Sequence, residues 1–120
     1  MKKVLIIEDD KDTLDIIHFL VDDLNIDVVA SSRILIISDI QAMNPDLILM
    51  DHWVGNGLGG DFCLEIKSNP ATKNIPVILI SAHSNLPQIA QKSCADGYLP
   101  KPFDLTEITG IIKQFIGEDK

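Results

Sequence analysis

Features that mark several classes of protein are scarce in this sequence of 120 residues. No apolar run is long enough to span a bilayer, so we expect no membrane contact. Only 10 residues are Lys or Arg against 18 Asp or Glu, and the net charge of −8 makes nucleic acid a poor direct partner. A surface of this charge instead suits a basic partner or a cation.

Cysteine is also scarce, since the chain holds only Cys63 and Cys94. They lack C-x-x-C spacing and lie in apolar-patterned segments, so we expect two buried, reduced thiols. The chain begins like a signal peptide, with two lysines before the apolar run Val4–Ile7. The acids that start at Glu8 end that run too early for a signal peptide. These features predict a reduced, cytoplasmic protein.

Short apolar runs recur along the chain and predict its strands. They do not alternate with polar residues, which is typical of strands covered on both faces of a parallel sheet. The runs are Val4–Ile7, Asp27–Ala30, Leu47–Met50, Val77–Ile80 and, weakly, Tyr98–Leu99. Helical patterns lie between them. Strand and helix thus alternate five times, which predicts an α/β fold with an open parallel sheet and helices on both faces.

The helical segments differ in how well they fit this plan. An apolar face predicts a helix over residues 10–24, and Asp104 with Glu107 resembles a capping pair at the start of the last helix. The segment 84–95 starts with good helix-start chemistry but has a thin apolar face. Within 31–43, four apolar residues from Ile34 fit poorly, and either a shifted helix or an exposed contact patch would explain them.

Polar residues follow four of the predicted strands. Glu8, Asp9 and Asp10 follow the first, Asp51 ends the third, Ser81 follows the fourth and Lys101 the fifth. Taken singly, such an acid is usually a helix cap, the serine a turn residue and the lysine a solvated charge. Taken together, they fall on the rim where open α/β sheets bind ligands.

The chemistry of this rim points to a divalent cation and a phosphoryl group. Converging carboxylates repel one another unless a cation lies among them, and Mg²⁺ prefers carboxylate and phosphate oxygens. A carboxylate can also act as a nucleophile and form an aspartyl-phosphate. The lysine and the serine can contact phosphate oxygens. The residues therefore suit Mg²⁺-dependent phosphoryl transfer onto an aspartate.

A competing interpretation starts from the glycines at residues 55–60, which fit the spacing G-x-G-x-x-G of a dinucleotide-binding loop. Such a loop should follow the first strand, whereas this one follows the third and has Asp51 at its entry. Ser81 also stands where an acid should hold the ribose. A flexible loop beside a working carboxylate is the better interpretation.

The motifs VLIIEDD, PDLILMD at 45–51, PVILISA at 76–82 and DGYLPKPF at 96–103 resemble the response-regulator receiver domain in order and spacing. The resemblance covers nearly the whole chain and implies a single receiver domain over residues 1–120, with no output domain in this chain. It also implies a flavodoxin-like, doubly wound fold with five parallel strands in the order 2-1-3-4-5. It implies Asp51 as the phosphoacceptor. It implies Mg²⁺ held by Glu8, Asp9, Asp51 and the backbone carbonyl of Trp53.

The same resemblance implies roles for three residues on later strands. Ser81 and Lys101 would bind the phosphoryl group, and Tyr98 would be the switch aromatic. The Lys101–Pro102 bond would be cis. The loop departs from the family at Gly55, where proline is usual, and should therefore be more mobile. In the family, the residues at Trp53 and His83 influence the lifetime of the phosphoryl group, while we interpret His52 as an ordinary loop residue.

The function implied is that of a signalling module. It would take a phosphoryl group from a phosphohistidine on a sensor histidine kinase or histidine phosphotransfer protein. The surface around 84–95, Tyr98 and the last helix would then change for a downstream target that the sequence does not identify. One alternative is a Mg²⁺-dependent phosphatase, but enzymes of the haloacid-dehalogenase type carry a second acid where this chain has Trp53. A degenerate docking domain is a third possibility, and the intact acids argue against it.

Overall fold

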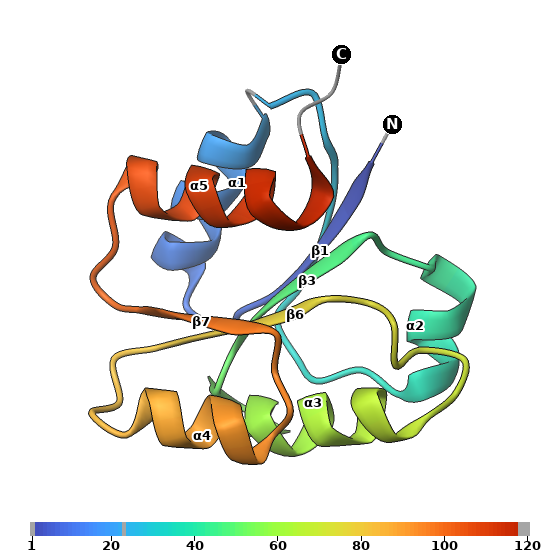
Figure 1. The fold of residues 1–120 in the computed structure, drawn as a ribbon. Helices are drawn as coiled ribbons and strands as arrows, with labels where there is room; N and C mark the ends of the chain where they lie inside the picture. Colours follow the sequence, from blue (N-terminus) through green and yellow to red (C-terminus); the bar gives the residue numbers. More distant parts are fainter. Residues whose placement is uncertain (1, 23, 118–120) are drawn as a thin grey trace.

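The apolar runs of the sequence become the parallel strands of one central sheet in the computed structural model, which describes residues 2–22 and 24–117 (Figure 1). The strands of this sheet are β1 (Lys3–Ile7), β2 (Asp27–Ser31), β3 (Leu47–Asp51), β6 (Val77–Ser81) and β7 (Gly97–Pro100). The helices are α1 (Lys11–Asp22), α2 (Ile37–Met43), α3 (Gly59–Ser68), α4 (Leu86–Lys92) and α5 (Leu105–Ile116). The predicted α/β fold class is confirmed.

The strand order of the sheet is β2-β1-β3-β6-β7, and every neighbouring pair is parallel. Numbered along the sheet's own strands this is the predicted order 2-1-3-4-5. Because all the strands point the same way, their carboxyl ends form one rim of the sheet. The residues predicted for the site therefore meet at this rim.

Two apolar layers explain why the strand sequences do not alternate. Leu5 and Ile7 pack into the layer under α2, α3 and α4, whereas Val4 and Ile6 pack into the layer under α1 and α5 (Figure 1). Successive residues of a strand point to opposite faces, so a strand covered on both faces must be apolar throughout. All five residues of β3, Asp51 included, are buried.

The first and last helices agree with their predicted patterns. In α1, Ile17 and Val21 are fully buried against the sheet. At the start of α5, the side chain of Asp104 accepts from the Glu107 backbone N–H at 2.8 Å, and the Glu107 carboxylate accepts from the Asp104 backbone N–H at 3.2 Å. The predicted capping pair is thus a complete capping box.

The fourth helix is shorter than the predicted span of 84–95. It begins at Leu86, with Pro87 in its first turn, and ends at Lys92. Cys94 lies just beyond it with φ of 60°, a left-handed conformation that cannot continue a helix. The prediction that both thiols are buried is therefore wrong for Cys94, which is exposed in this turn. It is confirmed for Cys63, which is buried, and this burial raises the pKa of the Cys63 thiol to about 12.

The poorly fitting segment contains a shifted helix. α2 begins only at Ile37, and the Asp39 carboxylate accepts from the Ile36 backbone N–H at 3.2 Å at its start. Ile34 and Leu35 precede the helix and pack partly against the core, while Ile36 is 63% exposed. Most of the apolar run therefore serves the core, and only Ile36 faces solvent.

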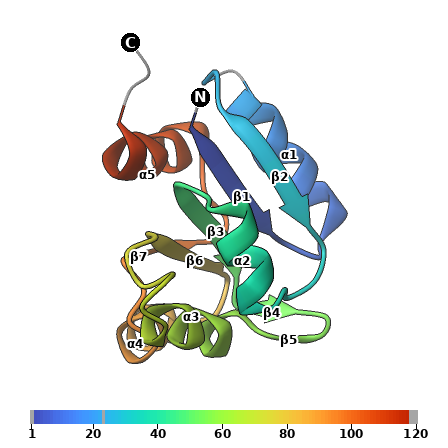
Figure 2. The same cartoon turned by 90° about the vertical axis from the view of Figure 1, so that its right-hand side faces the viewer.

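A small hairpin that the sequence analysis did not predict follows β3. Its strands are β4 (Trp53–Val54) and β5 (Gly57–Leu58), and they form a two-stranded antiparallel sheet. Val54 is its buried residue. Figure 2 places the hairpin at the carboxyl-end rim, beside the segment that leads from β2 into α2. It connects the end of β3 to α3.

Candidate functional site

Three carboxylates from two neighbouring strands meet at the rim. Glu8 and Asp9 follow β1 and Asp51 ends β3, and one oxygen of each lies within 4.8 Å of the others. The register pairs Ile7 with Met50, which brings the residues after them side by side. Glu8 is only 2% exposed and Asp51 only 7%, whereas Asp9 is exposed. The sheet therefore holds two negative groups largely out of water.

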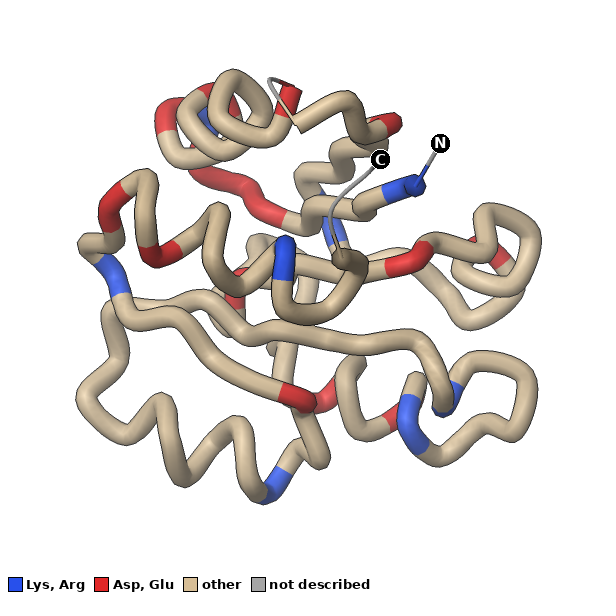
Figure 3. The backbone as a smooth tube through the Cα atoms, turned by 45° about the horizontal axis from the view of Figure 1, so that its top comes forward, with Lys and Arg blue, Asp and Glu red and all other residues tan. Residues whose placement is uncertain are grey.

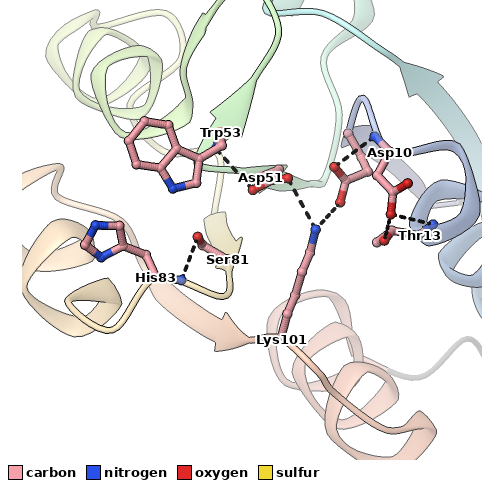
Figure 4. Close-up of polar contacts among 8 residues, drawn as sticks. Asp10, Thr13, Asp51, Trp53, Ser81, His83 and Lys101 are labelled. Carbon is pink, nitrogen blue, oxygen red and sulfur yellow. Dashed lines mark hydrogen bonds and ion pairs between the residues drawn. The ribbon is translucent and has the colours of Figure 1, made fainter.

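Lys101 partly compensates this charge. Its Nζ lies 2.7 Å from Glu8 Oε1 and 3.3 Å from Asp51 Oδ2 (Figure 4). Burial alone would lower the pKa of Lys101, but the hydrogen bond to Glu8 and the charge of Asp51 outweigh it and raise the pKa. The ammonium group therefore stays charged between the two carboxylates. The Lys101–Pro102 peptide bond is cis, as predicted.

The Lys101 ammonium group does not fully balance the negative charge around Glu8. Its burial and its contact with Asp51 raise the pKa of Glu8 to about 7, although Lys101 acts in the opposite direction. A second cation among these oxygens would favour the ionised form of Glu8. Close oxygen ligands with unbalanced negative charge are the donor set that a hard divalent cation prefers. The three residues thus fit Mg²⁺.

Asp51 itself is held in a defined orientation. Its Oδ1 accepts from the Trp53 backbone N–H at 3.1 Å, and its Oδ2 contacts Lys101. The chain turns back so closely at the start of α3 that a Cβ on Gly59 would lie 2.2 Å from the Asp51 backbone oxygen. Only glycine fits there, because any side chain would clash with the backbone at the end of β3.

Ser81 lies at the end of β6, which pairs with β3 in the sheet. It is buried, and its Oγ accepts from the His83 backbone N–H at 3.1 Å. Its hydroxyl proton can therefore be donated to another oxygen. Ser81 and Lys101 come from adjacent strands, since the Lys101 N–H donates to the Ser81 carbonyl at 3.0 Å. Phosphoryl binding by these two residues stays a prediction.

An aromatic group borders Asp51 on the side opposite the acids (Figure 4). The indole of Trp53 is 54% exposed and stacks on the His83 ring, with centroids 5.9 Å apart and planes 28° apart. The His52 ring meets the same indole edge-on at 5.0 Å. These rings form one wall of the approach to Asp51.

His52 has a structural role that the sequence analysis missed. Its Nδ1 accepts from the Gly60 backbone N–H at 3.0 Å, and its carbonyl accepts from the Gly59 N–H at 2.7 Å. It therefore caps α3, whose N-cap residue Leu58 offers no side-chain bond. Burial, followed by the nearby His83, lowers the pKa of His52, which favours the neutral ring that this bond requires. The interpretation as an ordinary loop residue is incomplete.

Asp10, which precedes α1, and Tyr98, on β7, do not belong to the group of carboxylates at the rim. Asp10 accepts from both the hydroxyl and the backbone N–H of Thr13, and the hydroxyl bond lowers the pKa of Asp10. Asp10 is thus a helix cap and does not belong to the cluster of carboxylates formed by Glu8, Asp9 and Asp51. Tyr98 lies on β7 and is 43% exposed, so its role as a switch stays a prediction.

The comparisons with known proteins agree with this geometry. The family model described as the response regulator receiver domain matches residues 4–113. Protein PilG of Pseudomonas aeruginosa is 31% identical over 117 residues, covering 95% of this chain and 87% of that protein. The phosphate regulon transcriptional regulatory protein PhoB of Escherichia coli is 26% identical over 115 residues, covering 93% of this chain and 50% of that protein. The chain therefore spans about half the length of the PhoB proteins that it matches.

A solved structure gives the same fold. The receiver domain of the sensor histidine kinase PA1611 from Pseudomonas aeruginosa, with a magnesium ion coordinated in its active-site cleft, superposes with a TM-score of 0.87. It is 22% identical, and the match covers 98% of both chains.

Within the described part of this chain, no helix has the length and apolarity needed to cross a membrane.

Proposed function

The chain belongs to the family of response regulator receiver domains, and we propose that it accepts a phosphoryl group on Asp51 with the help of Mg²⁺. Receiver domains are signalling modules that sensor histidine kinases phosphorylate, and they are not classical enzymes. The observation that carries the proposal is the group formed by Glu8, Asp9, Asp51 and Lys101 at one rim. Its oxygens and its ammonium group suit a cation and a phosphoryl group together.

Each residue has a role that follows from its place. Glu8, Asp9, Asp51 and the backbone carbonyl of Trp53 would hold Mg²⁺, which neutralises negative charge on the phosphoryl group and its acceptor when bound. The Asp51 carboxylate attacks the phosphorus, the bond from phosphorus to the donor imidazole nitrogen breaks, and its electron pair stays on that nitrogen. Lys101 exchanges its contact with Asp51 for one with a phosphoryl oxygen, and Ser81 donates its hydroxyl proton to another.

The partner on the input side would be a sensor histidine kinase or a histidine phosphotransfer protein. On the output side, we propose that the surface of α4, Tyr98 and α5 changes and binds a target protein. α4 supports this proposal because it is short and buries only Leu86 and Ala90. Phosphorylation should then alter amide hydrogen exchange in α4 and β7 more than in α1. A change confined to α1 would contradict this choice of output surface.

A direct test uses acetyl phosphate and Mg²⁺ with intact-mass spectrometry. The wild-type chain should gain one phosphoryl group, and Asp51→Asn should gain none. Asp10→Asn is the matched control, because Asp10 caps α1 and asparagine caps helices equally well. Equal phosphorylation of Asp51→Asn would contradict the assignment, and loss in Asp10→Asn would mean that the acids do not have separate roles.

The other functions considered have less support. None of the comparisons supports a phosphatase, and Trp53 occupies the position where such an enzyme would carry its second acid. A domain used only for docking would not need the buried Glu8 and Asp51 carboxylates, which are costly to keep without a cation or a phosphoryl group to bind.

A further inference from the structure

The side chain of Asn56 makes an uncommon pair of contacts for an exposed residue. Its Oδ1 accepts from the Ile34 backbone N–H at 2.6 Å, and its Nδ2 donates to the Ile34 carbonyl at 3.1 Å. The two bonds occupy both backbone groups of one residue, as a neighbouring strand would. They join the tip of the β4–β5 hairpin to the segment before α2, 22 positions away (Figure 2).

The hairpin that Asn56 holds lies directly between this segment and the carboxylates. A Cβ on Gly55 would lie 3.4 Å from Asp9 Oδ2, and a Cβ on Gly57 would lie 3.4 Å from Ile34 Cγ1. The hairpin begins at Trp53, whose N–H orients Asp51. A shift of the hairpin tip would therefore change the surroundings of Asp9 and the direction of the Trp53 backbone.

Trp53 anchors the base of the hairpin through its N–H bond to Asp51 and its ring contacts with His52 and His83, but little else fixes the tip. Each of its strands has two residues, and a hairpin of this size has little stability of its own in water. Val54 is its only buried residue, because Trp53, Gly57 and Leu58 are exposed. The paired bonds from Asn56 are consequently a large part of what holds the tip in place.

We propose that Asn56 is a positioning residue for the cation site. It holds the hairpin so that the Trp53 carbonyl and Asp9 are already arranged for Mg²⁺, and it couples Mg²⁺ binding to the segment around Ile34. The inference rests on the proposed function, since it concerns the same Mg²⁺. Because prearranged ligands lose less freedom on binding, losing this pair of hydrogen bonds should raise the Mg²⁺ dissociation constant about three- to tenfold.

The test compares Asn56→Ala with the matched control Asn69→Ala. Asn69 also accepts a backbone N–H in a loop, that of Ala71 at 2.9 Å, but it follows α3 at the end away from the site. Mg²⁺ is titrated into each chain without a phosphoryl donor, and amide NMR shifts give the dissociation constant. We expect weaker binding in Asn56→Ala and the wild-type value in Asn69→Ala.

Two further measurements separate positioning from a general loss of structure. With acetyl phosphate, Asn56→Ala should need about three- to tenfold more Mg²⁺ for half-maximal rate, yet reach a rate within about twofold of wild type at saturating Mg²⁺. Hydrogen exchange of the Ile34 amide should slow on adding Mg²⁺ in wild type, because coupling between two sites is reciprocal. That response should be absent in Asn56→Ala.

The possible outcomes distinguish this inference from the proposed function. If the wild-type chain binds Mg²⁺ and is phosphorylated, an unchanged Mg²⁺ affinity in Asn56→Ala overturns the inference alone. An equal loss of affinity in Asn69→Ala also overturns it, because the effect would then be general. A wild-type chain that neither binds Mg²⁺ nor gains a phosphoryl group overturns both.

Discussion

The residues on the two sides of Asp51 differ in chemical character, since one side is charged and the other is aromatic. On one side, Glu8 and Lys101 are joined by an ion pair in which the Glu8 side chain is 2% exposed. On the other side, the exposed Trp53 ring contacts two histidine rings, those of His52 and His83. In the proposed function, the charged side would bind the cation and the phosphoryl group, whereas the aromatic side would limit how a donor approaches Asp51. The family motifs describe the first side and say little about the second.

Figure 3 shows that charged residues are not confined to the surroundings of Asp51. Acidic positions are spread over much of the chain, and Lys or Arg occur at scattered positions between them. Lys101 is the cation that contacts Glu8 and Asp51 in the described part of the chain. Substitutions at the charged side should therefore alter both the electrostatics and the stability, whereas substitutions at the aromatic side should alter packing and capping.

The largest effect should come from Gly59→Ala, where the two sides meet. The new methyl group would lie 2.2 Å from the Asp51 backbone oxygen, so the start of α3 or the end of β3 must move. We expect a loss of at least about 3 kcal/mol in the free energy of unfolding, measured by urea denaturation. Gly110→Ala is the control, because a Cβ there meets nothing within 4 Å and α5 should gain about 1 kcal/mol. Equal effects of the two substitutions would mean that the close approach is not rigid.

Lys101→Ala should have the next largest effect on stability. It leaves Glu8 and Asp51 buried together without their ammonium partner. Removing one member of a buried pair commonly costs about 3–5 kcal/mol, and partial exposure of Lys101 reduces our expectation to about 2 kcal/mol at pH 8 without Mg²⁺. The loss should shrink toward pH 6, because a protonated Glu8 needs no partner. A loss that does not vary with pH would contradict this account.

Asp51→Asn should stabilise the fold while it abolishes phosphorylation. Asp51 contributes to the raised pKa of Glu8, about 7 instead of 4.5, so ionising Glu8 costs stability as the pH rises through this range. Without the Asp51 charge, we expect a gain of about 1 kcal/mol at pH 8 and little gain below pH 5. Asp15→Asn on the exposed face of α1 serves as the control. Urea denaturation without Mg²⁺ measures both, and a destabilised Asp51→Asn would show that the Lys101 contact outweighs the repulsion.

His52→Ala tests the aromatic side. Loss of the α3 cap should cost about 1 kcal/mol at pH 8. The pKa of folded His52 is lowered from 6.5, so the stability that its neutral ring provides is fully present above that pH and is lost as the pH falls through the folded value. The difference between wild type and His52→Ala should therefore narrow in acid. If the difference in the free energy of unfolding between wild type and His52→Ala does not vary with pH, the loss comes from packing against Trp53 and not from the cap.

The smallest effect should be a change in the intrinsic fluorescence of Trp53 when Mg²⁺ binds. The indole lies beside Asp51 and is largely exposed, so the added charge changes its surroundings without moving it into the core. The change should saturate at weak affinity, since Mg²⁺ keeps several waters. Asp9→Ala should remove most of it. An undiminished response in that variant would separate Trp53 from the cation site.

The fold and the charged side could be predicted because both depend on short, regular patterns. Apolar runs mark buried parallel strands, and polar residues directly after them must share a rim. The cap from His52 to Gly60 and the pair from Asn56 to Ile34 follow no such period, because they depend on how two loops fold back in space. The sequence also did not decide whether the apolar residues at 34–37 form a helix or a loop, because residues of either kind can pack on a core.

The ion pair between Lys101 and Glu8 also has a meaning for the folding of the chain. The two residues are 93 positions apart, and Lys101 reaches the rim only when β7 has joined β6 at the edge of the sheet. A chain without β7 in place can contain Glu8, Asp9 and Asp51, but it lacks the Lys101 ammonium group beside them. Under the proposed function, competence to accept a phosphoryl group would therefore arise only with the last strand, and an incomplete chain would not respond.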